Sequence, residues 1–118
     1  MSGYLTTHVL DTAAGCPGEG IELVLYKVID GQITELKRAT TNDDGRVDSP
    51  ILPTEEFSVG TYELHFFAGD YFRRSGTQLA DRAFLDEVVI RFGIADAQAH
   101  YHVPLLISPY SYSTYRGS

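Results

Sequence analysis

Three of the four histidines of this 118-residue chain lie on the non-core faces of two stretches that alternate as β-strands, and their spacing could support chemistry. The fourth, His65, lies in a third alternating stretch beside Glu63 and is expected to be structural or exposed. His100 and His102 are two residues apart, so on a strand they share one face at about 7 Å between Cα atoms. His8 lies in a second alternating stretch, on the face opposite the aliphatic positions. One neutral imidazole can take a proton from water while another holds or protonates a substrate, and such histidines can also bind zinc. A third alternative is packing against another subunit, because the same faces carry apolar neighbours.

Other reactive side chains give weaker signals. Arg46 directly follows Gly45 at the exit of a polar turn, where a single arginine is ordinarily solvated. The carboxylates of that turn lack the ligand spacing and the terminal Glu of an EF-hand calcium loop. Cys16 lies in a glycine-rich loop without a neighbouring base, which favours an incidental cysteine. The sequence also lacks a Gly-x-Ser-x-Gly elbow and a His-Glu-x-x-His motif.

The carboxyl end, residues 100–118, predicts two strands joined by a tight turn at Ser108-Pro109. The first strand alternates, and its expected core face consists of Tyr101, Val103, Leu105 and Ile107. The second is rich in Tyr, Ser and Thr and is expected to run to the last residue. Chain ends are usually frayed and featureless, so this dense ending indicates a terminus placed in a functional site.

The remaining chain predicts short strands with polar turns between them. Strands are expected at residues 4–11, 21–29, 33–41, 62–67 and 84–94, a loop at 12–20, a long connection at 49–60, and one or two helical turns at 68–75. With the two C-terminal strands, this pattern indicates an all-β fold, a two-sheet antiparallel sandwich of about eight strands with one short helix. The length suits a single domain, residues 1–118.

Composition excludes several classes of function. The net charge of −7 argues against nucleic-acid binding, because little in the chain would neutralise phosphates. No apolar run approaches the roughly 20 residues that cross a bilayer, and the N-terminus lacks the basic and apolar regions of a secretory signal. A single cysteine excludes an internal disulfide and fits a reducing compartment. A cytoplasmic protein is therefore expected.

Four segments together resemble the 5-hydroxyisourate hydrolase branch of the transthyretin-like family. They are Leu5-Thr6-Thr7-His8-Val9-Leu10-Asp11, Thr41-Asn42-Asp43-Asp44-Gly45-Arg46, His100-Tyr101-His102-Val103-Pro104-Leu105-Leu106 and Tyr112-Ser113-Thr114-Tyr115-Arg116-Gly117-Ser118. The resemblance spans essentially the whole chain in order. The terminal Tyr-Arg-Gly-Ser separates the hydrolases from the hormone carriers, in which the histidines, the arginine and this tail are replaced.

The resemblance implies a homotetramer, a dimer of dimers paired through edge strands, with active sites in a central channel where the dimers meet. The site residues that the resemblance implies are His8, Arg46, His102 and Ser118 as catalytic groups, Tyr115 and Arg116 as substrate-binding groups, and His100 as support. Arg46 is thereby expected to bind the ring carbonyls and the oxyanion, contrary to its interpretation as a solvated side chain.

The implied activity is hydrolytic opening of the six-membered ring of 5-hydroxyisourate in urate degradation, without metal or cofactor. His8 is assigned as the residue that activates water, with His102 as the alternative. A non-catalytic carrier of a small ligand is the competing class, and it predicts an aliphatic channel rather than one lined by imidazoles and arginine.

Overall fold

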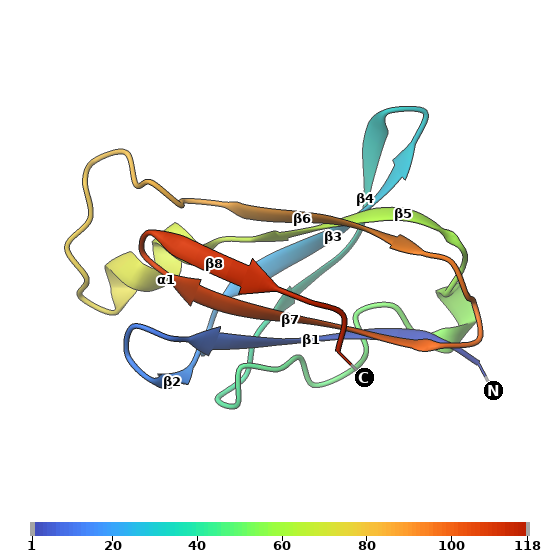
Figure 1. The fold of residues 1–118 in the computed structure, drawn as a ribbon, viewed down its shortest axis with the longest axis horizontal. Helices are drawn as coiled ribbons and strands as arrows, with labels where there is room; N and C mark the ends of the chain where they lie inside the picture. The colour runs from blue at the N-terminus through green and yellow to red at the C-terminus, as the bar shows by residue number, and fades with distance from the viewer. Residues whose placement is uncertain (1, 118) are drawn as a thin grey trace.

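In the computed structural model, which describes residues 2–117, two four-stranded sheets face each other as the layers of a sandwich (Figure 1). One sheet has the strand order β2-β1-β7-β8 and the other β4-β3-β5-β6. The strands are β1 (Tyr4–Asp11), β2 (Cys16–Pro17), β3 (Glu22–Ile29), β4 (Gln32–Thr40), β5 (Gly60–Phe66), β6 (Val88–Ile94), β7 (His100–Ser108) and β8 (Ser111–Thr114). The all-β sandwich expected from the sequence is confirmed.

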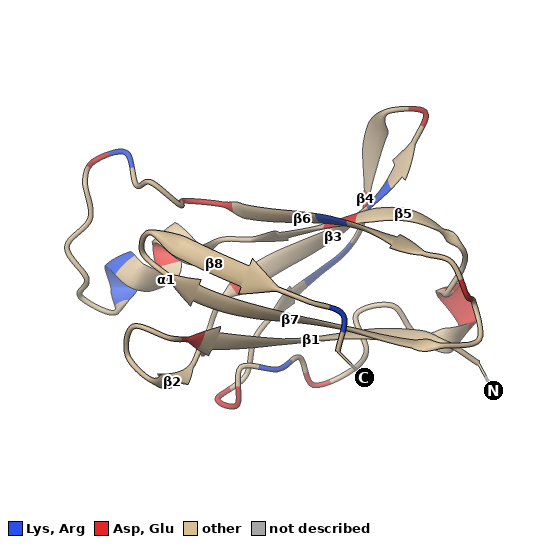
Figure 2. Ribbon diagram, viewed as in Figure 1, with Lys and Arg blue, Asp and Glu red and all other residues tan. Residues whose placement is uncertain are grey.

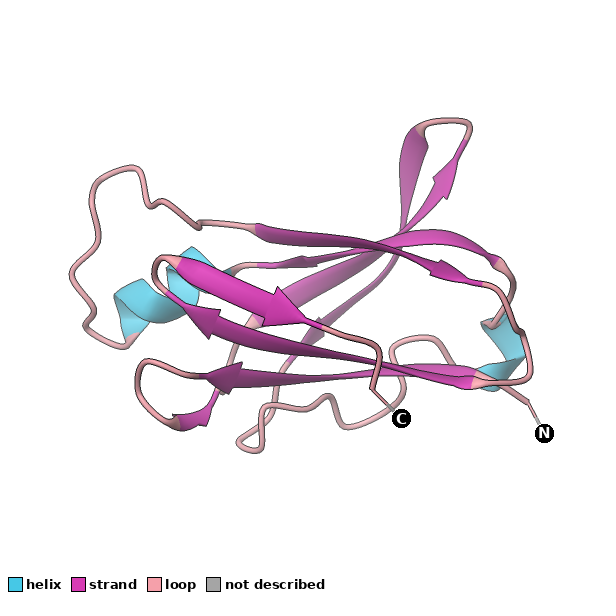
Figure 3. Ribbon diagram, viewed as in Figure 1, coloured by secondary structure: helices cyan, strands magenta, loops and turns pink. Residues whose placement is uncertain are grey.

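Two short helical segments lie at opposite ends of the sandwich (Figure 3). The helix α1 (Ala68–Arg74) follows β5, as predicted, and the 3₁₀ turn η1 (Thr54–Glu56) interrupts the long connection before β5. Helix α1 is fixed to the sandwich by Tyr71, whose hydroxyl donates a hydrogen bond of 2.7 Å to the buried carboxylate of Asp11. Burial raises the pKa of Tyr71, and the hydrogen bond to Asp11 raises it further. In the described chain, no helix is long and apolar enough to span a bilayer.

The core is filled by the alternating positions of the strands. In β1, Leu5, Thr7 and Val9 are buried, and in β7 all four predicted core residues are at most 6% exposed. Successive strand side chains point to opposite faces, so Thr6, His8, His100 and His102 lie on the outer face of the β1–β7 pair. The hydrophobic pattern therefore fixes the orientation of the histidines.

The pairing of β1 with β7 is parallel, which the sequence pattern does not reveal. Tyr4 pairs with His100, Thr6 with His102 and His8 with Pro104. The other pairs of strands are antiparallel. Because the two strands come from opposite ends of the chain, no crossover helix is needed to bring them together.

The loop predicted at residues 12–20 contains the short strand β2, which pairs with the end of β1. Two strand boundaries differ from the prediction by four residues, and the others by at most two. Strand β6 begins at Val88 rather than at Phe84, because the preceding residues are bound to helix α1: Asp86 accepts a hydrogen bond from the Gly69 amide and contacts Arg73. Strand β8 ends at Thr114 rather than at the last residue. Beyond it, Gly117 returns to the same register and forms an isolated antiparallel bridge with His102.

Charged residues are distributed unevenly over the two sheets. Lys, Arg, Asp and Glu lie on the loops, on α1 and on the β3–β6 sheet, while β7 and β8 carry none and β1 carries Asp11 at its end (Figure 2). The β1–β7–β8 surface is thus a weakly charged face that carries the histidines.

Candidate active site

Strands β1 and β7 bring three of the predicted histidines to one outer face. The parallel register sets Thr6 beside His102 and His8 two residues farther along β1. His8, His100 and His102 are all partly buried in the single chain. The sequence prediction that these imidazoles share one surface is consistent with this geometry.

The turn at residues 42–46 places Arg46 directly opposite His8. Asn42 organises this turn, since its side-chain oxygen accepts hydrogen bonds from the amides of Asp44 (2.9 Å) and Arg46 (3.1 Å). Gly45 allows the turn to approach β1, because it has a φ of +77° and its carbonyl accepts a 2.8 Å hydrogen bond from the Val9 amide. An antiparallel bridge between His8 and Arg46 follows.

The Arg46 side chain is half exposed at the edge of this surface. Its Nε donates to the Asp44 carboxylate at 2.9 Å. Within residues 2–117, Nη1 and Nη2 make no hydrogen bond, so the outer edge of the guanidinium can bind an anionic or carbonyl oxygen.

His8 is oriented by the same turn. Its Nε2 lies 2.9 Å from the Asp44 carbonyl oxygen. A carbonyl only accepts, so Nε2 carries the hydrogen and donates it, and Nδ1 is the remaining acceptor of a neutral His8. The Asp44 backbone thus fixes the tautomer of His8.

His102 is held from two sides. Its Nδ1 lies 2.8 Å from the Thr6 hydroxyl, and its carbonyl accepts a 2.7 Å hydrogen bond from the Gly117 amide. Burial lowers the pKa of His102, and the nearby charges of His100, Arg46 and His8 lower it further. The lowered pKa favours the neutral imidazole of His102, which can accept a proton.

The C-terminal tail is packed against the two β7 histidines. A Cβ on Gly117 would lie 2.7 Å from Cδ2 of His102, so only glycine fits against the ring. Arg116 lies with its guanidinium carbon 4.0 Å from the centre of the Tyr101 ring, and its Nη2 approaches the His100 carbonyl at 3.4 Å. Tyr115 is largely exposed, and Ser118 lies outside the described residues.

The structure also brings in two residues that the sequence analysis did not single out. The Thr6 hydroxyl contacts both His100 and His102, and the Tyr4 ring stacks on His100 at 4.1 Å between ring centres. Tyr4 and Thr6 precede His8 by four and two residues, so the period of a strand could have placed both beside the histidines.

His65, the fourth histidine, belongs to a separate cluster on the outer face of the other sheet. Its two nitrogens lie 2.8 Å from Glu63 and 2.9 Å from Glu87. The expectation that His65 is a structural or exposed histidine is consistent with these contacts. Across residues 2–117, no group of three His, Cys, Asp or Glu side chains is arranged to hold a metal ion.

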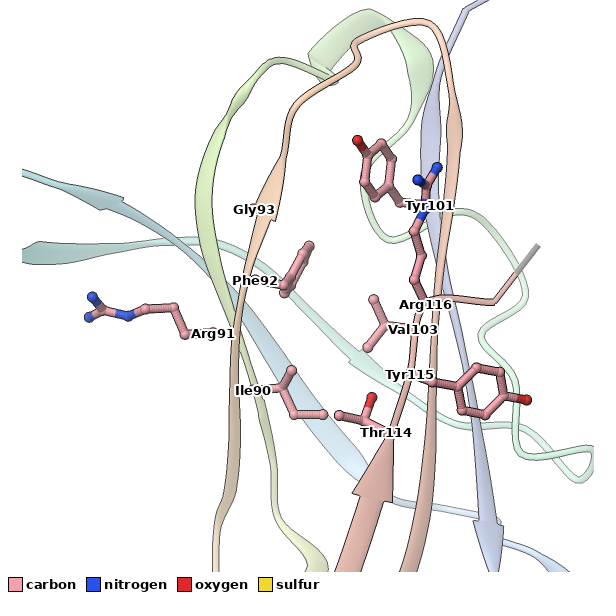
Figure 4. A pocket seen from close by; sticks show the side chains of 9 residues that line it. All are labelled: Ile90, Arg91, Phe92, Gly93, Tyr101, Val103, Thr114, Tyr115 and Arg116. Carbon is pink, nitrogen blue, oxygen red and sulfur yellow. The ribbon is translucent and has the colours of Figure 1, made fainter.

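A cavity of about 240 Å³ lies away from the histidines, between the open edges of β6 and β8. Ile90, Phe92, Val103 and Thr114 line it, with Tyr101 and Arg116 at one end, whereas the Arg91 side chain points away from it (Figure 4). The cavity is mainly apolar and carries none of the predicted catalytic groups.

Comparison with known proteins gives consistent matches over the full chain. The model of the HIUase/Transthyretin family matches residues 5–117. The 5-hydroxyisourate hydrolase of Pseudomonas aeruginosa is 62% identical over 116 residues, which cover 98% of this chain and 92% of that protein.

Two solved structures show the same fold. A structure of Klebsiella pneumoniae 5-hydroxyisourate hydrolase superposes with a TM-score of 0.80 at 33% identity, covering 98% of this chain and 94% of that one. A crystal structure of (S)-allantoin synthase superposes with a TM-score of 0.92 at 47% identity and covers 99% of this chain, which spans only 44% of the synthase chain.

Proposed function

The chain belongs to the HIUase/Transthyretin family, and we propose that it hydrolyses 5-hydroxyisourate, opening the six-membered ring to give 2-oxo-4-hydroxy-4-carboxy-5-ureidoimidazoline. The observation that carries this function is the meeting of His8, Arg46 and His102 at one surface, in a chain 62% identical to a 5-hydroxyisourate hydrolase. In urate degradation towards allantoin, this reaction breaks a cyclic amide with water. The chain is accordingly a hydrolase rather than a carrier.

The hydrogen bonds favour His102 over His8 as the group that activates water. His8 already donates Nε2–H to the Asp44 carbonyl, and its orientation suits a group that holds the substrate. His102 keeps Nε2 without a hydrogen-bond partner within residues 2–117, and its pKa is lowered by burial. His102 takes a proton from water at Nε2, and the water oxygen adds to the ring carbonyl carbon.

Arg46 stabilises the negative charge that this addition creates on the carbonyl oxygen. The backbone bridge holds Arg46 opposite His8, and Asp44 fixes the guanidinium through Nε. Preorganised donors of this kind contribute about 3–4 kcal/mol to lowering an activation barrier. Collapse of the intermediate then breaks the carbon–nitrogen bond: the leaving nitrogen takes the proton that Nε2 of His102 received from water, and the new carboxyl group ionises to a carboxylate.

The tail completes the pocket. Gly117 packs on the catalytic imidazole of His102, and its amide donates to the His102 carbonyl. Tyr115, Arg116 and Ser118 remain in the proposal as substrate-binding residues, with Ser118 as a donor to substrate or water, and His100 as a supporting residue. No metal or cofactor takes part in this mechanism.

We further propose that the domain, residues 1–118, assembles into a homotetramer whose sites lie where two dimers meet. Two features support this assembly: the weakly charged histidine face, and the open apolar cavity between the edge strands β6 and β8. Light scattering should give four times the 13.1 kDa chain mass. A monomer with full activity at micromolar concentration contradicts it.

A cytoplasmic location is also proposed, since the one cysteine, Cys16, cannot form a disulfide within the chain. Cell fractionation tests it, and recovery in a secreted fraction contradicts it.

The decisive experiment generates 5-hydroxyisourate with urate oxidase and follows its ultraviolet decay with and without this protein. Acceleration of the decay supports hydrolysis, whereas binding without consumption supports the carrier alternative. Arg46→Gln and His102→Asn should each lower kcat by about 100-fold or more. His65→Gln is the matched control, because it removes a histidine from the opposite sheet.

A further inference from the structure

The Thr6 hydroxyl lies between two imidazoles. Its Oγ1 is 2.7 Å from Nε2 of His100 and 2.8 Å from Nδ1 of His102. The parallel register produces this arrangement, since Thr6 pairs with His102 and its outward side chain also reaches the ring two residues earlier on β7.

A hydroxyl donates only one hydrogen bond, so the two imidazoles cannot choose their tautomers independently. If Thr6 donates to Nε2 of His100, then His102 donates Nδ1–H to Thr6 and presents an unprotonated Nε2 to the site. If the direction is reversed, His100 donates to Thr6, and His102 presents Nε2–H. The first arrangement makes His102 a base, and the second makes it an acid.

We propose that Thr6 is the positioning residue that couples the two histidines, holding His102 as a base and relaying its Nδ1 proton to His100 as water is deprotonated. This inference rests on the proposed hydrolase function. One proton moves from water to Nε2 of His102, one from Nδ1 to the Thr6 oxygen, and one from the Thr6 hydroxyl to Nε2 of His100. The net result is hydroxide bound to the carbonyl carbon, a neutral His102 and a protonated His100.

The surroundings favour this direction of transfer. The charged or titratable groups around the two imidazoles come from β1, the turn before residue 47 and the tail, and they are Tyr4, His8, Asp44, Arg46 and Arg116. Arg46 is bridged to His8, which lies on the far side of His102 from His100 along the parallel strands. A positive charge on His100 therefore lies farther along the strands from the Arg46 side than one on His102, whose ring centre is 5.9 Å away.

Tyr4 adds to this preference. Its ring stacks on His100 with an interplanar angle of 10°, and an aromatic face attracts a cation placed over it. The positive charge of Arg116 disfavours a second positive charge on His100. Its effect is limited because its guanidinium contacts the His100 carbonyl rather than the ring and lies over Tyr101. The proton therefore moves away from the reacting centre and towards an aromatic face.

The test compares Thr6→Val, which removes the hydroxyl at nearly constant shape, with Thr6→Ser, which keeps it. Thr7→Val is the matched control, because among residues 2–117 the Thr7 hydroxyl bonds only the Val103 carbonyl, in the core at 2.6 Å. Nitrogen-15 NMR of histidine-labelled protein should show a single tautomer of His102 in the parent and in Thr6→Ser, and a mixture in Thr6→Val. Thr6→Ala is a second hydroxyl-free variant, so the comparison does not depend on valine being accommodated.

Kinetics provide the second readout. We expect kcat to fall about 10- to 100-fold in Thr6→Val and to stay within about threefold of the parent in Thr6→Ser and Thr7→Val. Rates in mixtures of light and heavy water should show several protons in transit in the parent and fewer in Thr6→Val. Unchanged tautomers together with a kcat within threefold of the parent in Thr6→Val overturn the inference. If the parent does not consume 5-hydroxyisourate, the proposed function fails, while the NMR comparison still decides whether Thr6 couples the histidines.

Discussion

Gly45→Ala tests whether the close approach of the Arg46 turn to β1 creates the site. A Cβ at position 45 would lie 2.3 Å from the Val9 carbonyl oxygen, whereas real Cβ contacts essentially never fall below 3.0 Å. The turn must therefore move by at least about 0.7 Å, the difference between these two distances. This movement carries Arg46 away from His8 and strains the 2.8 Å hydrogen bond from the Val9 amide to the Gly45 carbonyl.

The structure contains a matched control for this substitution. Gly31 has the same φ of +77°, but nothing lies within 4 Å of its added Cβ. The left-handed conformation costs a side chain about 1–2 kcal/mol at either position. At Gly45 the strained or lost hydrogen bond of a buried amide adds about 1–3 kcal/mol, so Gly45→Ala should destabilise the fold by about 2–5 kcal/mol and Gly31→Ala by about 1–2 kcal/mol.

The effect on activity should separate the two variants further. A displacement near 1 Å at a catalytic group can cost about 100-fold in rate, so Gly45→Ala should lose about that much kcat/KM below its unfolding temperature. Gly31→Ala should keep the parent rate within about threefold. Urea denaturation gives the stability difference, and the decay of 5-hydroxyisourate gives the rates. Equal losses of stability and of activity in the two variants would mean that the close approach at Gly45 does not position Arg46.

Four further outcomes are expected. The lowered pKa of His102 places the acid limb of kcat/KM below pH 6.5, and a limb above that value contradicts His102 as the base. Hydrogen bonds from His65 and then Arg91 hold the pKa of Glu63 below its usual 4.5, so the stability it contributes is present above that pH and is lost as pH falls through the folded pKa. Glu63→Gln should therefore cost about 1–3 kcal/mol at pH 7 and clearly less at pH 3 in urea denaturation, whereas equal losses argue against the charged pairing. Deleting Gly117 and Ser118 should lower turnover about 100-fold or more and shift Tm by only a few degrees. Turnover near that of the parent would mean that the tail takes no part in catalysis. Dialysis against a strong chelator should leave the rate unchanged, whereas a loss that zinc restores supports a metal at the histidines.

Much of the fold follows from local features of the sequence. Alternation assigned the buried faces of β1 and β7, and therefore the outward direction of His8, His100 and His102, because successive strand side chains must point to opposite sides. The Asp30-Gly31 turn was equally predictable, since both residues adopt the positive φ that a tight hairpin requires. These features depend on neighbours within a few residues along the chain.

The site depended on contacts between distant segments. The family resemblance identified Arg46 as a site residue. Only the folded structure shows that the close approach of Gly45 to β1 lets Arg46 form a backbone bridge with His8. Strand β6 was predicted to begin too early because alternation continues from Phe84, whereas the contacts of Asp86 with α1 hold these residues outside the sheet. Local periodicity does not show that contacts with a helix replace pairing within the sheet.

The alternation of residue types is enough to predict which side chains face outward, and the types themselves limit the chemistry that is available. The parallel pairing of β1 with β7 arises only in the folded molecule. That pairing joins Thr6 to two histidines 94 and 96 residues away in the chain. Strand register follows from the burial of both strands' apolar faces in one common core, and this is a property of the packed molecule rather than of either segment.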